Sequence, residues 1–510
     1  MRGTQHFGAL ATAIAVIFVL AGCSHAVFSQ SGGNGGSGTS PVILTLHDTP
    51  ASGVTVTSFE VTISGAALEP GDISILSTPE TVELTQLQTN SVFLSTTQVP
   101  VGTYTGLTIT YSNPQFTIIN NSGVAITTPT GQCLANASCT VTNPTVTQLT
   151  ESLPSSSGQT FPSLSVTTGN QTLLEFDVNL NDVIQSNLSL DFSQSGAVTL
   201  NQTTNGTGQL STIDTLNVAG EVTSVDASSS TFVITPTEGQ SFTVTTNSAG
   251  TNPTTFEFAR DNCTANNFTC IAVGQIVDVT ADLQSDGQTF DAAEVDFDDA
   301  ANTQQVSGTI VSQTGTPPTS VLIVVHHTIP PVSSLPPGTG VIVTIGNPAS
   351  YVINNGSFVL PSGLSFASPS DVIVGQEVEA RVASTSSIVN GAFTTDRLAL
   401  EQTQLEATVS SVNSQTTPFP FFVLTPLPAL FSQSSVDPAL QLEVVDTSSN
   451  EPSGATQFIG TVYQDLTPEN IGGLTVGQPV TTSGFLFNTT GSVGFPSIIA
   501  MIVRGEVPGT

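Results

Sequence analysis

The sequence predicts an all-β protein in which an N-terminal β-sandwich precedes three small β-barrels. Apolar and polar residues alternate over 54–63, 105–111 and 172–180, as expected for strands that bury one face. No segment combines sustained helical periodicity with good helix formers, and only 181–186 and 467–471 are expected to form single helical turns. Clusters of Gly, Pro, Asn and Asp separate the alternating segments and place turns there.

The charge composition excludes several classes of protein. The 510 residues include 38 acidic and five basic side chains, so the formal net charge is −33, yet only 8% of residues are charged. Five arginines and no lysine cannot neutralise a nucleic-acid backbone, which excludes nucleic acid as a partner. A hydrophobic content of 38% is too high for charge-driven disorder. Abundant Thr, Val, Gly and Pro argue against a coiled coil.

Residues 1–22 have the features of a secretory signal peptide. An apolar run from Phe7 to Leu20 is short for a membrane span and ends in small residues. The following Leu-Ala-Gly-Cys resembles the lipobox of bacterial lipoproteins, and this resemblance implies that Cys23 is the lipidated first residue of the mature chain. Acyl chains on Cys23 would anchor the protein in a membrane. The alternative is an ordinary secretory signal with a chance cysteine.

Residues 23–40 comprise the lipidated cysteine and a Gly/Ser-rich tether. The stretch 29–40 is a flexible coil with a root-mean-square reach of about 20 Å, which lifts the folded part away from the lipid surface. The lipoprotein resemblance implies that an Asp after the cysteine would favour the inner membrane in some lineages, but Ser24 stands there. The expected location is therefore the cell envelope at the outer membrane, with the periplasmic and surface-exposed sides both open.

The other four cysteines form two close pairs. Cys133 and Cys139 enclose one short loop, and Cys263 and Cys270 enclose another. An oxidising envelope permits disulfides, and the local pairing is favoured among the three possible ones. The alternative is a metal site, but neither pair has the two-residue spacing of zinc knuckles and no histidine lies nearby.

The first folded segment, 41–205, carries the motifs of a sandwich domain. It contains Thr-Leu-His-Asp-Thr-Pro at 45–50, Val-Glu-Leu at 82–84 and Leu-Glu-Phe-Asp-Val at 174–178. In the Gly-Thr-Tyr-Thr element at 102–105, the glycine predicts a tight turn before a strand. This order resembles an uncharacterised β-domain of bacterial lipoproteins, a domain of unknown function. Gly-Thr-Tyr-Thr is also similar to an element of transthyretin-like and carboxypeptidase-regulatory-like sandwiches. The resemblances imply a transthyretin/Ig-like β-sandwich and no known activity.

The remaining chain contains a threefold repeat. Val-Gly-Gln occurs at 273–275, 374–376 and 476–478, and each copy precedes a predicted strand. Similar opening and closing segments delimit three modules, which are residues 214–300, 303–402 and 403–510. The pattern resembles a second domain-of-unknown-function family of bacterial secreted proteins. This resemblance implies small barrels of the oligonucleotide/oligosaccharide-binding (OB) type. Proline-rich insertions interrupt the second and third modules at 330–337 and 418–428.

The most concentrated charge lies in a predicted hairpin of the first repeat, where eight of the 38 acidic residues fall between positions 278 and 299. Alternation turns Asp278 outward on one strand and Glu294 and Asp296 outward on the next. A three-residue loop, 285–287, would set Asp278 opposite Glu294, where like charges are unfavourable. These three carboxylates therefore predict a Ca²⁺ or Mg²⁺ site. The alternative is a solvated acidic face that keeps the barrel soluble.

The histidines at 326–327 and at 47 could each have either a metal-binding or catalytic role or a purely structural one. His326 and His327 follow an apolar strand, and neighbouring strand residues point to opposite faces. We therefore expect one inside or at the strand end and one in solvent, rather than a shared metal. His47 beside Asp48 has the residue types of an acid–base pair, but it lies at an expected strand end.

Known catalytic signatures are missing from the sequence. It has no nucleophile elbow, His-Glu-x-x-His, Walker loop or Cys-x-x-Cys-His. With no tryptophan and four scattered tyrosines, a stacking platform for sugars or bases is not expected. The Phe-rich segment 419–422, with Phe431, is either an exposed patch for a partner or, more often for such residues, a core strand.

The predicted function is that of a membrane-anchored envelope lipoprotein with a non-catalytic binding, adhesion or scaffolding role. Its ligand is an undefined protein or glycan, and no cofactor is expected apart from the Ca²⁺ considered above. Two alternatives stay open. One is an extracytoplasmic hydrolase of unrecognised type acting on envelope or extracellular polymer, because glycosidase chemistry needs only two carboxylates. The other is a cation-dependent structural module.

Overall fold

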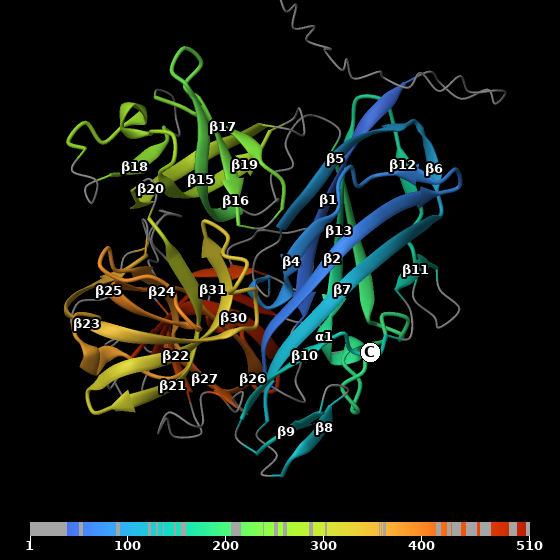
Figure 1. The fold of residues 1–510 in the computed structure, drawn as a ribbon. Helices are drawn as coiled ribbons and strands as arrows, with labels where there is room; N and C mark the ends of the chain where they lie inside the picture. The colour runs from blue at the N-terminus through green and yellow to red at the C-terminus, as the bar shows by residue number, and fades with distance from the viewer. Residues whose placement is uncertain are drawn as a thin grey trace, which may run out of the picture. The chain divides into compact units, whose positions relative to one another are not determined.

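Strands make up almost all of the regular structure, as the alternating pattern predicts (Figure 1). The described residues lie within one unit, Ser37–Thr510. The computed structural model describes residues 38–49, 55–87, 92–120, 124–128, 131–135, 137–146, 149–154, 160–205, 216–237, 239–248, 253–258, 263–284, 289–300, 303–355, 358, 360, 364–414, 420–425, 430, 440–444, 456–459, 471–488 and 497–505.

Helical structure is limited to short turns. The turn expected at 181–186 is present as α1 (Leu180–Val183). Of the turn expected at 467–471, residues 467–470 lie outside the described residues, and η5 (Ile471–Gly473) begins at its last residue. The other described turns are η1 (Leu84–Gln86), η3 (Phe268–Cys270) and η4 (Pro369–Asp371). None of these described helices is long and apolar enough to cross a membrane.

Two sheets form the N-terminal sandwich. The first has the order β14-β13-β1-β5, and only β1 and β13 run parallel in it. Its strands are β1 (Thr39–Thr49), β5 (Val92–Pro100), β13 (Gln171–Asn179) and β14 (Val198–Asn205). The second sheet is antiparallel, with the order β10-β7-β2-β3, and β11 also pairs with β7 and β4 with β2. Its strands are β2 (Thr55–Glu69), β3 (Ile73–Ser74), β4 (Glu80–Glu83), β7 (Gly106–Ile119), β10 (Ser138–Thr142) and β11 (Thr150–Leu153).

Two further strand pairs flank these sheets. The glycine of the predicted Gly-Thr-Tyr-Thr element opens β6, as its turn signal suggests. The pairs are β6 (Gly102–Tyr104) with β12 (Leu164–Val166), and β8 (Ile126–Thr128) with β9 (Gly131–Cys133). Both predicted disulfides are present. Cys133–Cys139 joins β9 to β10, and Cys263–Cys270 ties the start of a loop to η3.

The sandwich core forms where the apolar faces of the two sheets meet. In β2, Phe59, Val61 and Ile63 point inward because alternate residues of a strand face the same side. Strand β1 is buried on both faces. Its residue Val42 joins the sandwich core, whereas Ile43 packs against the core of the first barrel. A strand buried on both sides has a continuous apolar run, which explains the sequence of β1.

Each of the three repeats contains a ring of five strands with the order 1-2-3-5-4, which confirms small β-barrels in the C-terminal part of the chain. These orders are β15-β16-β17-β20-β19, β21-β22-β23-β25-β24 and β26-β27-β28-β31-β30. Strands 3 and 5 are parallel in every barrel. Strand 1 closes each barrel by pairing antiparallel with strand 4.

Strand 3 differs among the barrels. In the second it is continuous, whereas in the first and third a short parallel strand, β18 or β29, continues it after an insertion. The first barrel contains β15 (Leu216–Asp226), β16 (Thr231–Pro236), β17 (Phe242–Thr246), β18 (Thr255–Glu257), β19 (Ile276–Leu283) and β20 (Thr289–Asp299). The second contains β21 (Gln305–Gly315), β22 (Pro318–Ile329), β23 (Gly340–Ile353), β24 (Glu377–Val382) and β25 (Ala392–Leu400). The third contains β26 (Thr403–Asn413), β27 (Phe421–Thr425), β28 (Leu440–Val444), β29 (Gln457–Ile459), β30 (Pro479–Phe487) and β31 (Ser497–Gly505).

The repeated Val-Gly-Gln forms the turn that leads into strand 4 of each barrel. Its glycine has a φ of 87°, 94° or 91°, a region that favours glycine. The glycine amide donates to a carbonyl of strand 1, and the amide of the same strand-1 residue donates back to the glutamine carbonyl. The glutamine side chain accepts from the amide three residues earlier, at 2.6, 2.8 and 3.1 Å. The Val-Gly-Gln repeat therefore marks the turn after which strand 4 pairs with strand 1 and closes the barrel.

Direct contacts join the modules. The ring of Phe93 in the sandwich lies 5.4 Å from that of Phe290 in the first barrel. In the second barrel, the Gln376 side chain donates a buried hydrogen bond of 2.9 Å to the backbone carbonyl of Leu486 in the third. The connections are also short, because β25 ends at Leu400 and β26 begins at Thr403. Such contacts restrict movement between neighbouring modules.

We predict that Gly477→Ala destabilises the protein by about 1–2 kcal/mol, because its φ of 91° strains any residue with a Cβ. A Cβ at Gly477 would meet no atom within 4 Å, so this cost isolates the backbone strain. Urea unfolding of the purified chain measures it. Gly65→Ala is the control, since its Cβ would make only ordinary contacts with Thr110. Equal stability of the two variants would contradict the proposed role of the turn.

Candidate functional site

The three carboxylates predicted to bind a cation lie on adjacent strands of the first barrel, with Asp278 on β19 and Glu294 and Asp296 on β20. Their predicted pairing is wrong, because Asp278 lies opposite Asp296 and Glu294 lies opposite Thr280. Two extra residues cause the shift. The amide of Gln284 bonds the carbonyl of Thr289, which leaves four connecting residues instead of three, and β20 has a one-residue bulge at Ala293.

A shift of two residues preserves side-chain parity, so Asp278, Glu294 and Asp296 still share one face of the hairpin. The predicted loop 285–287 lies outside the described residues. Within the described part of the chain, no group of three or more His, Cys, Asp or Glu side chains is arranged to hold a metal ion. The cation site stays a prediction for which the geometry offers no support.

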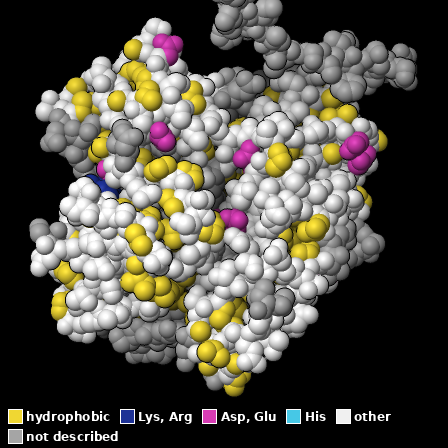
Figure 2. Space-filling model, in the orientation of Figure 1, with side chains coloured by type: hydrophobic (Ala, Val, Ile, Leu, Met, Phe, Trp, Pro, Cys, Tyr) yellow, Lys and Arg dark blue, Asp and Glu magenta, His cyan; other side chains and the backbone are white. Residues whose placement is uncertain are grey.

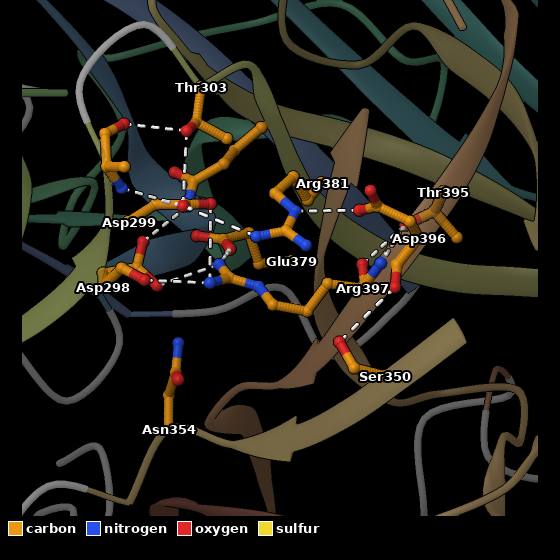
Figure 3. A network of polar contacts seen from close by, with 12 residues as sticks. Asp298, Asp299, Thr303, Ser350, Asn354, Glu379, Arg381, Thr395, Asp396 and Arg397 are labelled. Carbon is orange, nitrogen blue, oxygen red and sulfur yellow. Dashed lines mark hydrogen bonds and ion pairs between the residues drawn. The ribbon is translucent and has the colours of Figure 1, made fainter. Parts of the chain in front are cut away.

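The alternative of a solvated acidic face is wrong at the end of β20. Asp298 and Asp299 are only 1% and 4% exposed, and both face Arg397 of β25, which is 5% exposed (Figure 3). The Arg397 guanidinium lies 3.1 Å from Asp298 Oδ1 and 3.4 Å from Asp299 Oδ2, and it donates a further hydrogen bond to Glu379 of β24. We call Asp298, Asp299, Glu379, Arg381 and Arg397 the acidic seam. It joins the first barrel to the second.

Strand pairing explains why the seam needs so many carboxylates. Arg381 on β24 lies directly opposite Arg397 on β25, and like charges in that position repel. Arg381 is partly exposed and forms an ion pair of 2.8 Å with Asp396 and a longer contact of 3.6 Å with Asp299. Gln305, the first residue of β21, donates to Asp298 at 2.7 Å. The carboxylates thus neutralise two facing arginines in a water-poor environment.

Acidic groups outnumber arginines around the seam, and burial raises the pKa of two of these acids. Burial, followed by the negative charge of Asp298, raises the pKa of Glu379 well above its usual value, although Arg397 opposes this shift. Burial and the charges of Asp278 and Asp298 likewise raise the pKa of Glu401. Because Glu379 is 5% exposed and contacts Arg397, a substrate would reach it only if the seam opened.

A second polar junction connects the sandwich to the second barrel through His326 of β22. The imidazole is 2% exposed and donates from Nε2 to the backbone carbonyl of Thr57, at 2.8 Å, and from Nδ1 to Glu377 Oε1, also at 2.8 Å. Burial lowers the pKa of His326, but the charge and hydrogen bond of Glu377, the charge of Glu83 and the Thr57 carbonyl outweigh it. The pKa rises to about 9. His326 is therefore a charged link between the two modules at neutral pH.

The neighbouring His327 is half-buried rather than in solvent, which corrects half of the expectation for this pair. Burial and the charge of His326 lower its pKa to about 4, against the opposing charge of Asp298. Adjacent histidines thus carry different charges at neutral pH.

The structure describes some of the remaining predicted site residues and leaves others outside its described part. Phe422 is completely buried in β27, which confirms the core-strand interpretation for this part of the Phe-rich segment. His47 and Asp48 lie within β1, where their parallel partners are Asp177 and Val178. The described part of the chain does not include Cys23, most of the tether, Phe419 or Phe431.

No sequence motif indicated the acidic seam or the charged role of His326. The distribution of the arginines is the one feature of the sequence that points to the seam. The chain has only five arginines, and two of them, Arg381 and Arg397, fall in one repeat. The acidic residues that face them lie partly in the preceding repeat, and only the packing of the two barrels brings these groups together.

We predict that Arg397→Leu lowers the free energy of unfolding by about 3–5 kcal/mol, because it leaves buried carboxylates without their cation. Arg381→Leu is the matched control. Its side chain is 31% exposed, so its loss should cost about 1 kcal/mol or less. Chemical denaturation at pH 7 measures both values. If the two substitutions had equal effects, the seam would not depend on Arg397.

We also predict a pH-dependent stabilisation by His326. Its folded pKa of about 9 exceeds the ordinary 6.5, so its contribution is complete below pH 6.5 and disappears as the pH rises through 9. The stability difference between the wild type and His326→Gln should shrink by about 3 kcal/mol over this range. His327→Gln should show the opposite trend, because its lowered pKa gives a contribution that is lost as the pH falls from 6.5 to 4. Differences that do not change with pH would contradict both assignments.

Comparison with known families bears on the N-terminal part only. Residues 39–212 match the family model described as Domain of unknown function (DUF4382), which covers the sandwich and about a third of the chain. No curated protein matches the chain. An N-terminal domain of unknown function is thus confirmed for the sandwich, at the place where the sequence motifs predicted one.

Proposed function

We propose that this protein is a lipid-anchored lipoprotein of the cell envelope, at the outer membrane, which acts as a non-catalytic scaffold for binding. The observation that carries the proposal is the way in which its charged side chains are used. Arg397, Asp298 and Glu379 hold two barrels together, and His326 holds the sandwich to the second barrel. These charged side chains, which could otherwise take part in catalysis, therefore serve to join modules.

The location rests on the sequence. The leader 1–22, Cys23 and the Gly/Ser-rich tether form the order expected of an anchored lipoprotein. The disulfides Cys133–Cys139 and Cys263–Cys270 agree with an oxidising compartment. A tether that ends in a sandwich packed against three barrels would present one firm body at a distance from the lipid surface.

We predict that Cys23→Ala moves the protein from the membrane fraction to the soluble extracytoplasmic fraction, because the anchor would be lost. The double variant Cys133→Ala/Cys139→Ala is the control, since it removes two cysteines without touching the anchor. It should stay with the membrane. Fractionation followed by immunoblotting measures both. Unchanged membrane retention of Cys23→Ala would rule out the proposed anchor.

The binding role needs a separate test in intact cells. Chemical crosslinking followed by purification of the protein should recover the same envelope component in repeated experiments, and Cys23→Ala should reduce that recovery. A protein that crosslinks to nothing reproducible, while it still releases products from envelope polymers, would support the hydrolase alternative instead.

A further inference from the structure

The junction between the sandwich and the second barrel contains two facing carboxyl groups. Glu60 of β2 lies directly opposite Glu83 of β4 in the strand register. Side chains in that position have Cβ atoms about 5 Å apart, so two negative charges there repel each other. On the same strand, three residues before Glu60, the Thr57 carbonyl accepts the hydrogen bond from His326 of the barrel. The charge of this carboxyl pair therefore bears directly on the junction.

The two carboxyl groups have different surroundings. Glu83 is 2% exposed and accepts four hydrogen bonds, which favour its ionised form. The donors are the hydroxyls of Ser58 and Thr85 and the amides of Phe59 and Thr85. Glu60 is only half-buried and accepts a hydrogen bond of 3.2 Å from Gln115. When the pair carries a single negative charge, Glu83 therefore keeps it and Glu60 holds the proton.

The protonation of Glu60 changes near neutral pH. Burial, followed by the charge of Glu83, raises its pKa from the ordinary 4.5 to about 7, although the hydrogen bond from Gln115 opposes the shift. The folded form with Glu60 in this position therefore loses stability as the pH rises from 4.5 through 7. The other titratable groups at the junction are His326 and Glu377, which contact each other. Figure 2 shows that the surface around β2 and β7 is mostly uncharged, with few acidic side chains.

The side chain of Gln115 on β7 connects Glu60 to the second barrel. Its Nε2 donates to Glu60 Oε1 at 3.2 Å and to the backbone carbonyl of Pro337 at 3.3 Å. The next residue of that barrel loop, Gly338, fits closely against the sheet. Its carbonyl accepts from the Thr117 hydroxyl at 3.0 Å, and a Cβ on it would lie 2.5 Å from Thr117 Oγ1. The position of the loop is therefore sensitive to small movements of the side chains beneath it.

We propose that Glu60 is a proton-sensitive switch that controls how firmly the second barrel is docked on the sandwich. While Glu60 is protonated, it faces the ionised Glu83 without repulsion and stays in contact with Gln115, which holds Pro337. Once Glu60 is ionised, repulsion from Glu83 turns its side chain toward solvent, where a carboxylate is better solvated. Gln115 then loses one of its two partners, and the barrel loop is held less firmly.

This switch operates in a lower pH range than the charge of His326. His326 has a pKa of about 9, so it keeps its positive charge while Glu60 loses its proton. The inference goes beyond the proposed scaffold role, because it makes the rigidity of the assembled modules depend on pH between 6 and 8.

Hydrogen–deuterium exchange of the purified full chain at pH 6 and pH 8 measures the docking, with protection factors corrected for the intrinsic effect of pH. The reporters are the amides of Gly338 and Thr339, which are hydrogen-bonded within the barrel loop. Their protection should fall about threefold to tenfold from pH 6 to pH 8 in the wild type. The upper value is the linkage expected for a pKa of about 7, and the partial exposure of Glu60 reduces it.

Glu60→Gln removes the charge and keeps the side-chain shape, so the loop should be equally protected at both pH values. Glu80→Gln is the matched control, because Glu80 lies on the same strand as Glu83 but opposite Ile63. It should show the pH dependence of the wild type. Gln115→Leu removes the connection, so protection should be low at both pH values. Thermal melting at pH 6 checks that each variant is folded.

Three results would overturn the switch. The wild-type loop could be equally protected at pH 6 and pH 8, or Glu60→Gln could lose as much protection as the wild type. In the third case Gln115→Leu keeps the full pH dependence, which would mean that Glu60 does not act through Gln115. All of these measurements use purified protein, so they are independent of the membrane anchor and of any envelope partner.

Discussion

The guanidinium of Arg397 neutralises carboxylates from two successive barrels, and the packing of the first barrel against the second depends on this contact. Asp298 and Asp299 end one barrel, while Glu379 and Arg397 lie on adjacent strands of the next. Moving one arginine and several carboxylates out of water is costly unless they satisfy one another. The seam meets that condition through direct ion pairs, a hydrogen bond from Gln305 and a pKa of Glu379 that burial raises well above its usual value.

Two buried cationic side chains lie at junctions between modules. Much of the strongest charge–charge interaction lies inside, at the junctions formed by Arg397 and His326. This distribution suits a protein that has to keep its modules together.

Local sequence patterns predicted most of the fold. Alternation located strands such as β2 and β13, and the spacing of Val-Gly-Gln divided the C-terminal part into three barrels. These features could be read because they depend on neighbouring residues. Glycine adopts the required positive φ, and the following glutamine bonds an amide three positions away. The short loops of the two disulfides were predictable for the same reason.

The sequence by itself determined the strand content, the repeated barrels, the disulfide pairs and the side-chain parity of the acidic hairpin. Only the tertiary structure decided which carboxylates meet which arginine. One additional loop residue and one bulge moved Asp278 from Glu294 to Asp296, and such single-residue changes in register leave no clear signal in an alternating sequence. The contact between Asp298 and Arg397 spans 99 positions. It depends on the packing of two barrels, which no local pattern encodes.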